Sequence, residues 1–287
     1  RSMLKIGVLG AGHLGIIHIR LILELKDQYE MIGFFDPNEE NAKKVTEEFG
    51  IKRFDSMDEL ISAVDCLDIV TPTLSHYDCA SKSIKAGKHV FIEKPVTKTV
   101  EEARNLIVLK EEAGVQVKVG HVERFNPAFV AAQEFFGRPM FIETHRLAQF
   151  NPRGTDVPVV LDLMIHDVGI AMALVDSPIE RIDSIGVRVL SPTEDIANAR
   201  LLFANGCVAN LSASRVSEKK AREIRVFQDS GYLSLDFMNQ KGHLIKKSGP
   251  SLERHEVPVE QGEPLALELE SFLSCVVETT TPKTDGS

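Results

Sequence analysis

A glycine-rich segment, Gly-Ala-Gly-His-Leu-Gly from Gly10 to Gly15, constrains the fold more than any other feature of the chain. It lies directly between an apolar run, Leu4–Leu9, which predicts a strand, and the helical pattern Leu14–Leu25. The first glycine of such a motif permits a tight turn, the second, Gly12, lets a ligand approach the backbone, and the third lets the helix pack closely on the strand. The segment therefore predicts the first strand–helix unit of a dinucleotide-binding fold.

The start of this first helix suits a pyrophosphate, because it offers free N–H groups and the positive end of the helix dipole. Asp36 ends the second predicted strand, about 20 residues after the last glycine of the motif. A carboxylate there accepts hydrogen bonds from the adenosine ribose, and it would repel a 2′-phosphate by up to about 4 kcal/mol at an effective dielectric constant of about 20. No arginine is adjacent to Asp36 in the sequence. We therefore expect NAD rather than NADP as the cofactor, against the alternative that Asp36-Pro37 is a plain turn.

Strand and helix patterns alternate through residues 3–120, and the strands are almost continuously apolar. This alternation is typical of a parallel sheet covered by helices on both faces. We therefore predict an α/β protein whose N-terminal domain, residues 3–120, is a doubly wound, NAD-binding Rossmann domain. The predicted strands are Leu4–Leu9, Met31–Phe35, Cys66–Val70, His89–Ile92 and Val115–Val119, and the predicted helices are Leu14–Leu25, Glu39–Phe49, Met57–Val64, His76–Ala86 and Val100–Ala113.

The pattern changes after Gly120, where strands begin to outnumber helices. Asn205-Gly206 joins two alternating runs, and Asn-Gly is the strongest short-range signal for a hairpin. Residues 121–287 are therefore predicted to form an α+β domain built on a largely antiparallel sheet. The predicted helices are Asn126–Phe136, Val160–Val175 and Pro264–Glu278, and the predicted strands are Met140–Ala148, Ile179–Leu190, Ile196–Phe203, Cys207–Arg215, Glu223–Gln228 and Tyr232–Asp236.

Composition excludes several classes of protein. The 287 residues include 42 acidic and 33 basic side chains, a formal net charge of −9, and a nucleic acid polymer would need clustered lysine and arginine. No apolar stretch of about 20 residues is free of charge, so no membrane span is predicted. The four cysteines lack CxxC spacing, which favours a cytoplasmic protein without disulfides or a structural zinc site. The loop-like segment Thr279–Ser287 directly follows a helical pattern, so we expect a further element beyond it.

The carboxyl ends of the parallel strands are expected to line one crevice, in which the cofactor binds. Besides the glycine motif, these ends carry Thr71-Pro72 with His76, and then Glu93-Lys94-Pro95. His76 is expected to be a pocket residue on the cofactor side rather than a base, whereas His18 and His89 are expected in structural surroundings. The residues predicted to bind the cofactor are Gly10, Gly12, His13, Leu14, Gly15, Asp36, Thr71, Pro72, His76, Glu93 and Lys94.

Lys94 and the pair Asp162 and His166 are the candidate catalytic residues. A lysine at the carboxyl end of a strand, facing a nicotinamide, can hold a substrate hydroxyl, and burial would shift its pKa. Asp162 and His166 are four residues apart in a predicted helix, so they share a face on which the carboxylate can set the tautomer of the imidazole and stabilise its protonated form. Taken singly, a Lys-Pro pair is more often a surface turn, and an Asp/His pair is more often a surface pair. A metal site is disfavoured, because no HExxH motif is present.

Taken together, Gly10–Gly15, Glu93-Lys94-Pro95 and the pair Asp162 and His166 resemble the pattern of the glucose–fructose oxidoreductase/inositol dehydrogenase/MocA (Gfo/Idh/MocA) family, over essentially the whole chain. The resemblance implies a Rossmann domain that binds NAD(P) and an open-faced α/β domain that supplies the substrate pocket and the oligomer interface. It also implies that Lys94 positions and polarises the reacting hydroxyl, that His166 is the acid/base and that Asp162 supports it.

Further segments are similar to the bacterial UDP-N-acetylglucosamine 3-dehydrogenase branch of this family. Enzymes of that branch oxidise the C3 hydroxyl of the sugar to a ketone, ahead of transamination for modified lipid A sugars. The resemblance implies NAD-dependent oxidation of this nucleotide sugar. A dehydrogenase of a free polyol, a tetrapyrrole or another small molecule, and an NAD-binding sensor without turnover, stay open as alternatives. The segments are Val119–Pro127, Pro152–Asp156, Asp195–Arg200 and Val208–Val216.

A diphosphate substrate would need local cations in this acidic chain. The residues predicted to bind substrate are Lys94, Arg124, Asn126, Arg146, Arg153 and His166. The three arginines lie in segments expected to face the crevice, and guanidinium groups bind phosphate through paired hydrogen bonds. The alternative is that they pair with the carboxylates of Glu123, Glu143 or Asp156.

The second domain is also expected to carry the oligomer contact. Leu201–Phe203 and Val208–Leu211 place apolar residues on both faces of their predicted strands. One face of the sheet packs on helices, so the other is expected to be buried against another subunit. This favours a homodimer or a homotetramer, between which the sequence does not choose.

Overall fold

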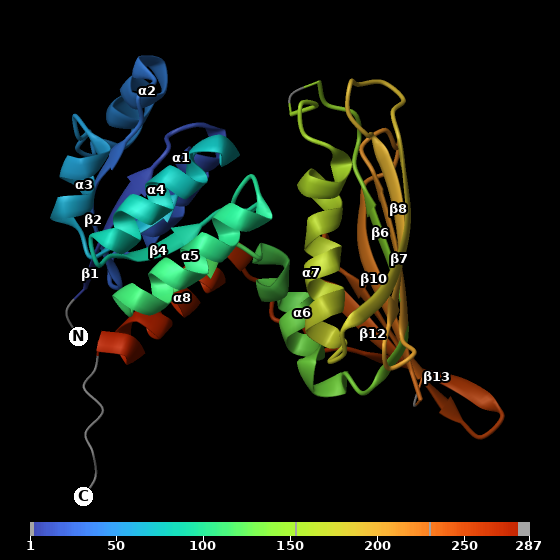
Figure 1. Ribbon diagram of the computed structural model, residues 1–287. Helices are drawn as coiled ribbons and strands as arrows, with labels where there is room; N and C mark the ends of the chain where they lie inside the picture. Colours follow the sequence, from blue (N-terminus) through green and yellow to red (C-terminus); the bar gives the residue numbers. More distant parts are fainter. Residues whose placement is uncertain (1–2, 153, 230, 281–287) are drawn as a thin grey trace, which may run out of the picture. The chain divides into compact units, whose positions relative to one another are not determined.

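The computed structural model describes residues 3–152, 154–229 and 231–280. The chain divides into two compact units, of which the first comprises Arg1–His121 with Leu265–Ser287, and the second comprises Val122–Pro264. In Figure 1 the first unit begins in blue and ends in the red helix α8. Each unit has its own sheet, so each is described by itself.

The first unit is built on a five-stranded parallel sheet of order β2-β1-β3-β4-β5. Strands β3 and β4 are buried along their whole length, which requires cover on both faces and explains their continuous apolar runs. All five predicted strands are present, which confirms the α/β class. The elements are β1 (Leu4–Leu9), α1 (His13–Glu24), β2 (Tyr29–Phe35), α2 (Glu39–Phe49), α3 (Met57–Ala63), β3 (Cys66–Ile69), α4 (Thr73–Lys85), β4 (His89–Ile92), α5 (Val100–Ala113), β5 (Val117–Val119) and α8 (Pro264–Thr280).

Local signals fix the ends of the helices that cover this sheet. The side chain of Asn38 accepts a hydrogen bond from the first turn of α2, and Thr99 forms a capping box with Glu102 at the start of α5. Both helices end at a glycine with positive φ, Gly50 at 64° and Gly114 at 65°. These caps fix the ends of α2 and α5.

The strand order reverses at β1, which has β2 on one side and β3 on the other. In doubly wound sheets the crevice at such a reversal, outside the carboxyl ends of the strands, is the ligand-binding position. The glycine motif leaves β1 at this point. The fold therefore places the motif where a dinucleotide fold requires it.

Helix α8 belongs to the first unit, whereas the sequence prediction assigned residues 121–287 to the second domain. The side chains of Leu269, Phe272 and Val276 are fully buried, and the ring of Phe272 lies 5.8 Å from that of Phe91 on β4. The hydroxyl of Tyr29 on β2 donates to the backbone carbonyl of Leu269 at 2.6 Å. The apolar stripe of this helix is visible in the sequence, but the surface that it covers is not. Residues 281–287 lie outside the described part of the chain, and with them the expected further element.

The second unit is built on an eight-stranded sheet of order β13-β12-β11-β10-β6-β9-β8-β7. Neighbouring strands are antiparallel except β6 and β9, which confirms the largely antiparallel sheet. The hairpin at Asn205-Gly206, between β8 and β9, is also confirmed. The elements are the 3-10 helix η1 (Val122–Phe125), α6 (Pro127–Ala132), the 3-10 helix η2 (Gln133–Phe135), β6 (Pro139–Leu147), the π-helical turn η3 (Val160–Met164), α7 (Ile165–Leu174), β7 (Ile179–Val187), β8 (Ile196–Phe203), β9 (Val208–Ser214), β10 (Ala221–Gln228), β11 (Gly231–Asp236), β12 (Lys241–Ser248) and β13 (Ser251–Glu256).

Strands β12 and β13 were not predicted from the sequence. Every residue of β13 is exposed, and its sequence Ser-Leu-Glu-Arg-His-Glu has no apolar face. Backbone pairing with β12 alone places it in the sheet. A strand without a buried face leaves no period-2 signal, which is why β13 was missed. In β12 only Gly242 and Leu244 are buried, so its apolar signal is weak.

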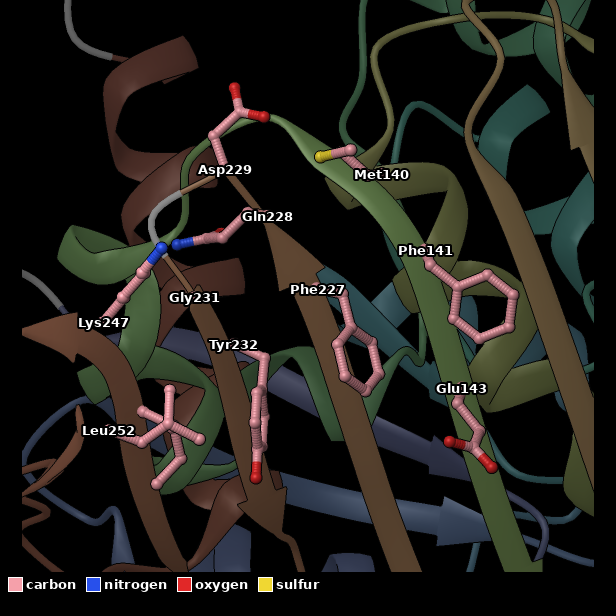
Figure 2. A pocket seen from close by; sticks show the side chains of 11 residues that line it. Met140, Phe141, Glu143, Phe227, Gln228, Asp229, Gly231, Tyr232, Lys247 and Leu252 are labelled. Carbon is pink, nitrogen blue, oxygen red and sulfur yellow. The ribbon is translucent and has the colours of Figure 1, made fainter. Parts of the chain in front are cut away.

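One face of this sheet packs on helices α6 and α7. Alternate residues of β8, among them Leu201 and Phe203, are buried in a cluster with Phe129 of α6 and Ile170 of α7. The opposite face carries a row of aromatic side chains on β6, β10 and β11 (Figure 2). The sheet is therefore open on one side, as the family resemblance implied.

The open face has its apolar centre elsewhere than the sequence suggested. The rings of Phe141, Phe227 and Tyr232 follow one another across the strands, with centroids 5.9 and 5.0 Å apart, in a hollow of about 630 Å³ (Figure 2). The prediction pointed to Leu201–Phe203 and Val208–Leu211 instead. There Leu201, Phe203, Ala209 and Leu211 fill the helix-covered core, whereas Leu202 and Val208, which are register partners, lie half-buried on the opposite face.

Three simple findings complete the fold. No helix in the described ranges is long and apolar enough to cross a membrane. The described residues contain no group of three or more His, Cys, Asp or Glu side chains arranged to hold a metal ion. All four cysteines lie in the described part of the chain and are free thiols.

Candidate functional site

The turn between β1 and α1 has the geometry that a bound pyrophosphate requires. Gly10 has a φ of +103°, and a Cβ there would lie 2.6 Å from the carbonyl group of Val70. A Cβ on Gly15 would collide with the backbone oxygen of Gly10. A Cβ on Gly12 would meet nothing within 4 Å, so the backbone faces open space at the helix N-terminus, where no side chain caps the free N–H groups. His13 and Leu14, in the first turn of α1, are exposed beside this space.

Asp36 ties the end of β2 to this turn. One carboxylate oxygen accepts from the backbone N–H of Ala11 at 2.7 Å, and the other accepts from that of Asn38 at 2.8 Å. A carboxylate oxygen can accept more than one hydrogen bond, so the side chain keeps acceptor capacity for ribose hydroxyls. The structure thus places Asp36 against the glycine motif.

An arginine does lie beside Asp36 in space, although none is adjacent in the sequence. Arg53 donates to the backbone carbonyl of Asp36 at 3.0 Å. The same guanidinium binds both carboxylate oxygens of Glu39, at 2.7 and 3.0 Å, and this hydrogen-bonded pair lowers the pKa of Glu39. The guanidinium of Arg53 is therefore engaged by Glu39 and is not available to bind the 2′-phosphate of NADP, which agrees with NAD as the cofactor.

His76 joins the loops that follow β3 and β4. Its ring nitrogens lie 2.8 Å from the backbone oxygen of Pro95 and 2.9 Å from that of Thr71. The side chain is buried, and α4 begins directly after Pro72. His76 thus holds together two loops whose residues were predicted to bind the cofactor. Lys94, in the second of these loops, is half-buried.

The carboxylate of Glu93 has partners that the sequence did not suggest. One oxygen lies 3.0 Å from Nε2 of His18, and the other accepts from the backbone N–H of Lys94 at 3.1 Å. Burial alone would raise the pKa of Glu93, but the hydrogen bond and the charge of His18 outweigh it, and the pKa is lowered. Glu93 was predicted to bind the cofactor. In the structure its two carboxylate oxygens are already engaged by His18 and by the backbone of Lys94.

In the second unit, Asp162 and His166 lie at the change from a π-helical turn to an α-helix. Asp162 is in η3 and His166 is in the first turn of α7, whereas the sequence predicted one regular helix, Val160–Val175. Asp162 is exposed and His166 is half-buried. Single π-helical turns inside helices are often found at functional sites, because the extra residue per turn re-aims the side chains.

The arginines predicted to bind phosphate are largely engaged inside the second unit. Arg146, which is 3% exposed, binds Asp167 through two hydrogen bonds of 3.0 and 2.9 Å, and it also lies 3.3 Å from Glu123. Arg124 donates to the backbone oxygen of Gly169 at 3.0 Å. The alternative of carboxylate pairing therefore describes Arg146. Arg153 lies outside the described residues.

Asn126, the remaining predicted substrate ligand, is 3% exposed at the start of α6. Its side-chain oxygen accepts from the backbone N–H of Ala128 at 3.0 Å, and its side-chain nitrogen donates to the backbone oxygen of Phe237 at 2.9 Å. Both polar atoms serve the local fold, since they cap a helix and join it to Phe237, the residue after β11. This arrangement favours a structural role.

A cavity of about 520 Å³ in the second unit reveals cationic residues that the sequence analysis missed. Asp162 lies in its wall together with Arg146, Arg215, Lys220 and Arg222. Arg215 is neutralised by Asp195 at 2.8 Å, as Arg146 is by its own carboxylates, whereas Lys220 and Arg222 are exposed.

Sheet register explains how Arg222 reaches this cavity. Arg222 is the register partner of Arg146 across β10 and β6, strands that are far apart in the sequence. The only signal in the sequence is the local run Lys219-Lys220-Ala221-Arg222 at the start of a predicted strand. Arg222 lines the same cavity as Asp162 because β10 lies next to β6 in the sheet.

The glycine turn, the carboxylate at the end of β2 and the separate open-faced sheet define the class of a two-domain, NAD-binding oxidoreductase. Comparison with known families agrees with this class. Residues 4–121 match the oxidoreductase family with an NAD-binding Rossmann fold, GFO_IDH_MocA, and residues 130–234 match the GFO/IDH/MocA C-terminal domain. The chain belongs to the Gfo/Idh/MocA family of NAD-dependent oxidoreductases.

Two relatives show how far the similarity extends. The UDP-N-acetylglucosamine 3-dehydrogenase of Acidithiobacillus ferrooxidans is 36% identical over 95% of this chain and 88% of the relative. Its solved structure superposes with a TM-score of 0.92, covering 98% of this chain and 91% of that one. The scyllo-inositol 2-dehydrogenase (NAD(+)) of Bacillus subtilis is 27% identical over 97% of this chain and 87% of the relative. A levoglucosan dehydrogenase solved with NADH and levoglucosan, at 17% identity and a TM-score of 0.86, shares the fold.

Proposed function

We propose that this enzyme oxidises the C3 hydroxyl of UDP-N-acetylglucosamine to a ketone, with NAD as the oxidant. The observation that carries the proposal is the cavity of the second unit, in whose wall the carboxylate of Asp162 and the exposed cations Lys220 and Arg222 lie together. Its volume of about 520 Å³ is within the ordinary range of small-molecule sites. The 36% identical relative named for this reaction supports the same substrate.

Three side chains are assigned to the reaction. His166 takes the proton of the reacting hydroxyl, and Asp162 holds the tautomer of the imidazole and stabilises its protonated form. Lys94 donates hydrogen bonds to the same hydroxyl oxygen, which orients it and favours loss of its proton. The cofactor, when bound, supplies the acceptor for the hydride that leaves C3.

The diphosphate is assigned to Lys220 and Arg222 rather than to the arginines that the sequence suggested. The guanidinium of Arg146 is bound to two carboxylates, and Arg124 donates into the backbone of α7. Arg222 lies 4.0 Å from Glu123 and keeps an exposed guanidinium, and Lys220 is exposed beside it. An exposed guanidinium can bind phosphate oxygens in pairs, and the ammonium adds a point charge.

The test mixes the purified protein with NAD and UDP-N-acetylglucosamine and follows the absorbance of NADH. An aminotransferase with its amino donor is added to remove the ketone, because its formation can be uphill. Free N-acetylglucosamine and scyllo-inositol are the comparison substrates. NADH formation with the nucleotide sugar, and not with the two comparison substrates, supports the proposal. Faster turnover of scyllo-inositol would instead assign the chain to polyol oxidation, the activity for which the Bacillus relative is named.

We further propose that the open face of the second unit binds a second copy of the chain. The aromatic row of Phe141, Phe227 and Tyr232 lies in an apolar hollow, and the neighbouring Met140 and Leu252 are 55% and 73% exposed. Apolar surface of this kind is characteristic of a subunit contact. Light scattering after size-exclusion chromatography should give a dimer or tetramer, and Phe227→Glu should shift it towards the monomer. A monomeric wild-type protein would contradict this assignment.

A further inference from the structure

A charged histidine lies in the core of the first unit, away from any solvent. His18 of α1 is 0% exposed, and its Nδ1 lies 2.7 Å from Oδ2 of Asp68 on β3. Its Nε2 lies 3.0 Å from Oε1 of Glu93, the residue that follows β4. The side chain therefore joins a helix to two neighbouring strands through polar contacts. Burying such a set is costly, and an apolar cluster of the same size would be at least as stable.

Both contacts of His18 are made with carboxylate oxygens, which only accept hydrogen bonds when ionised. With both carboxylates ionised, each ring nitrogen donates and the ring is an imidazolium. Burial raises the pKa of Asp68, and the charge and hydrogen bond of His18 oppose that rise. Burial alone would lower the pKa of His18, but Asp68 and Glu93 together raise it to about 10. The other oxygen of Asp68 is buried without a hydrogen-bond partner among the described residues. Asp68 thus makes its side-chain hydrogen bond to His18 and serves as its counter-ion.

Glu93 connects this buried pair to the loop at the end of β4. Its second oxygen accepts from the backbone N–H of Lys94, and Gly120 lies against the carboxylate, where a Cβ would approach both oxygens to 3.2 Å. The backbone of Glu93 donates to Ile69 on β3, and that of Gly120 donates to Ile92. The carboxylate is therefore fixed by a charge, by a backbone donor and by a neighbour without a side chain.

We propose that His18 is a positioning residue, whose imidazolium holds the Glu93 carboxylate and, through it, sets the orientation and charge environment of Lys94. The inference rests on the proposed function only for the role of Lys94 in contact with the substrate hydroxyl. It explains why the first unit keeps a buried ion pair behind the glycine motif. It also gives Glu93 a role that differs from cofactor binding.

Other charged groups face the same cluster and must be counted in any test. Glu268 of α8 accepts from the backbone N–H of His121 at 2.7 Å, and its charge acts on His18 and Glu93. Lys118 of β5 lies near Glu268 and donates to Ser271 at 2.7 Å. Glu268 and Lys118 are present in every variant that is compared. A difference in kcat or in reactivity between a His18 variant and its control is therefore caused by His18.

The test compares His18→Gln with His89→Gln. His89 is also a buried histidine of the first unit, at the opposite end of β4, where it accepts from the backbone N–H of Gln116 at 2.9 Å. His18→Gln is expected to lower kcat by about 10²-fold, the scale of a small misplacement of a reacting group, and to leave NAD binding unchanged. His89→Gln is expected to keep kcat. If the two variants lose kcat equally, or if His18→Gln loses only NAD affinity, the positioning role is wrong.

A second measurement needs neither substrate nor cofactor. Lys94 is acylated with a water-soluble reagent at a series of pH values, and the modified peptide is quantified by mass spectrometry. In His18→Gln the pH dependence of Lys94 acylation should shift relative to the wild type, whereas it should stay in place in His89→Gln. An unchanged profile would overturn the proposal even if UDP-N-acetylglucosamine proves not to be the substrate. Absence of turnover in the wild type, with a shifted profile, would instead contradict only the proposed function.

One further variant keeps the test decisive if His18→Gln does not fold, and a double variant sharpens the test if it does. Asp68→Asn keeps an acceptor for His18 but removes the counter-ion, so it should shift the acylation profile in the same direction. Combined with Glu93→Gln, His18→Gln should cost little more in kcat than either change alone, because both act through one carboxylate. Additive losses, or a wild-type profile in Asp68→Asn, would contradict the inference.

Discussion

The guanidinium of Arg146 binds both carboxylate oxygens of Asp167, the residue directly after His166. Both partners are buried, at 3% and 2% exposure. Burial raises the pKa of Asp167, and the charge of Arg146 opposes that rise. The pair thus fixes the first turn of α7 against β6, and the half-buried His166 lies on that turn.

Replacing Arg146 should therefore destabilise the protein strongly. Arg146→Met leaves Asp167 buried without its hydrogen-bonded counter-ion, and breaking a buried pair in this way costs about 3–5 kcal/mol. Urea unfolding measures the loss. The matched control is Arg222→Met, at the paired position of β10, where the exposed side chain should contribute much less to stability. Equal losses in the two variants would show that Arg146 is not a structural anchor.

Lys220 and Arg222 should govern affinity for the nucleotide sugar. A charge-assisted hydrogen bond contributes about 1.5–3 kcal/mol, so removing either side chain should raise KM by about tenfold or more. The affinity for NAD should not change. Lys219→Ala is the control, because this neighbouring lysine is exposed and lies outside the cavity lining. The proposal for the diphosphate fails if KM is the same in all three variants.

Lys94→Ala and His166→Ala should each lower kcat by about 10²–10⁴-fold, the usual contribution of a positioned acid or base. Asp162→Asn should lower kcat less and shift the pH profile of kcat, because an amide no longer stabilises the protonated imidazole. Steady-state kinetics across pH measures both effects. Near wild-type kcat in both alanine variants, with a verified substrate, would contradict the assigned roles.

Cofactor preference should depend on Glu39 as well as on Asp36. Glu39→Gln frees the fork of Arg53, which lies beside the backbone of Asp36 and would then attract a 2′-phosphate. Combined with Asp36→Ser, which removes the repelling carboxylate, it should move the ratio of kcat/KM for NAD and NADP towards NADP. The control is Glu40→Gln, a neighbouring exposed residue paired with Lys44. An unchanged ratio in the double variant would show that Arg53 does not reach the adenosine ribose.

Glu268 should make stability depend on pH near neutrality. Burial is the largest cause of its raised pKa of about 7, the N–H of His121 opposes the rise and the charge of Glu93 adds to it. The pKa in the folded state exceeds the unfolded value of 4.5, so the folded protein holds a proton that the unfolded chain releases. The stabilisation is complete below pH 4.5 and is lost as the pH rises through about 7. In Glu268→Gln this part of the pH dependence should disappear, which urea unfolding at several pH values can measure.

Much of the first unit could be predicted because its strands are continuously apolar and because α2, α3 and α5 carry side-chain caps. The glycine motif and Asp36 were located from spacing alone. The pairing of Arg146 with Asp167 and the place of Arg222 could not be found in this way, because the first depends on how α7 packs against β6 and the second on the order of the strands in the sheet. The same holds for Glu93, whose partner His18 is 75 residues earlier in the chain. Local sequence patterns determine where helices and strands form, whereas the pairing of charged side chains depends on how those helices and strands pack together.

Helix α8 has a consequence for how the protein is made. The first unit is interrupted by all of Val122–Pro264, so α8 leaves the ribosome only after the whole second unit. Until then Phe91 lacks the ring of Phe272, and the hydroxyl of Tyr29 lacks its acceptor on Leu269. The second unit, which is continuous in sequence, can fold as soon as it is synthesised, while the cofactor-binding sheet must wait until α8 has followed it.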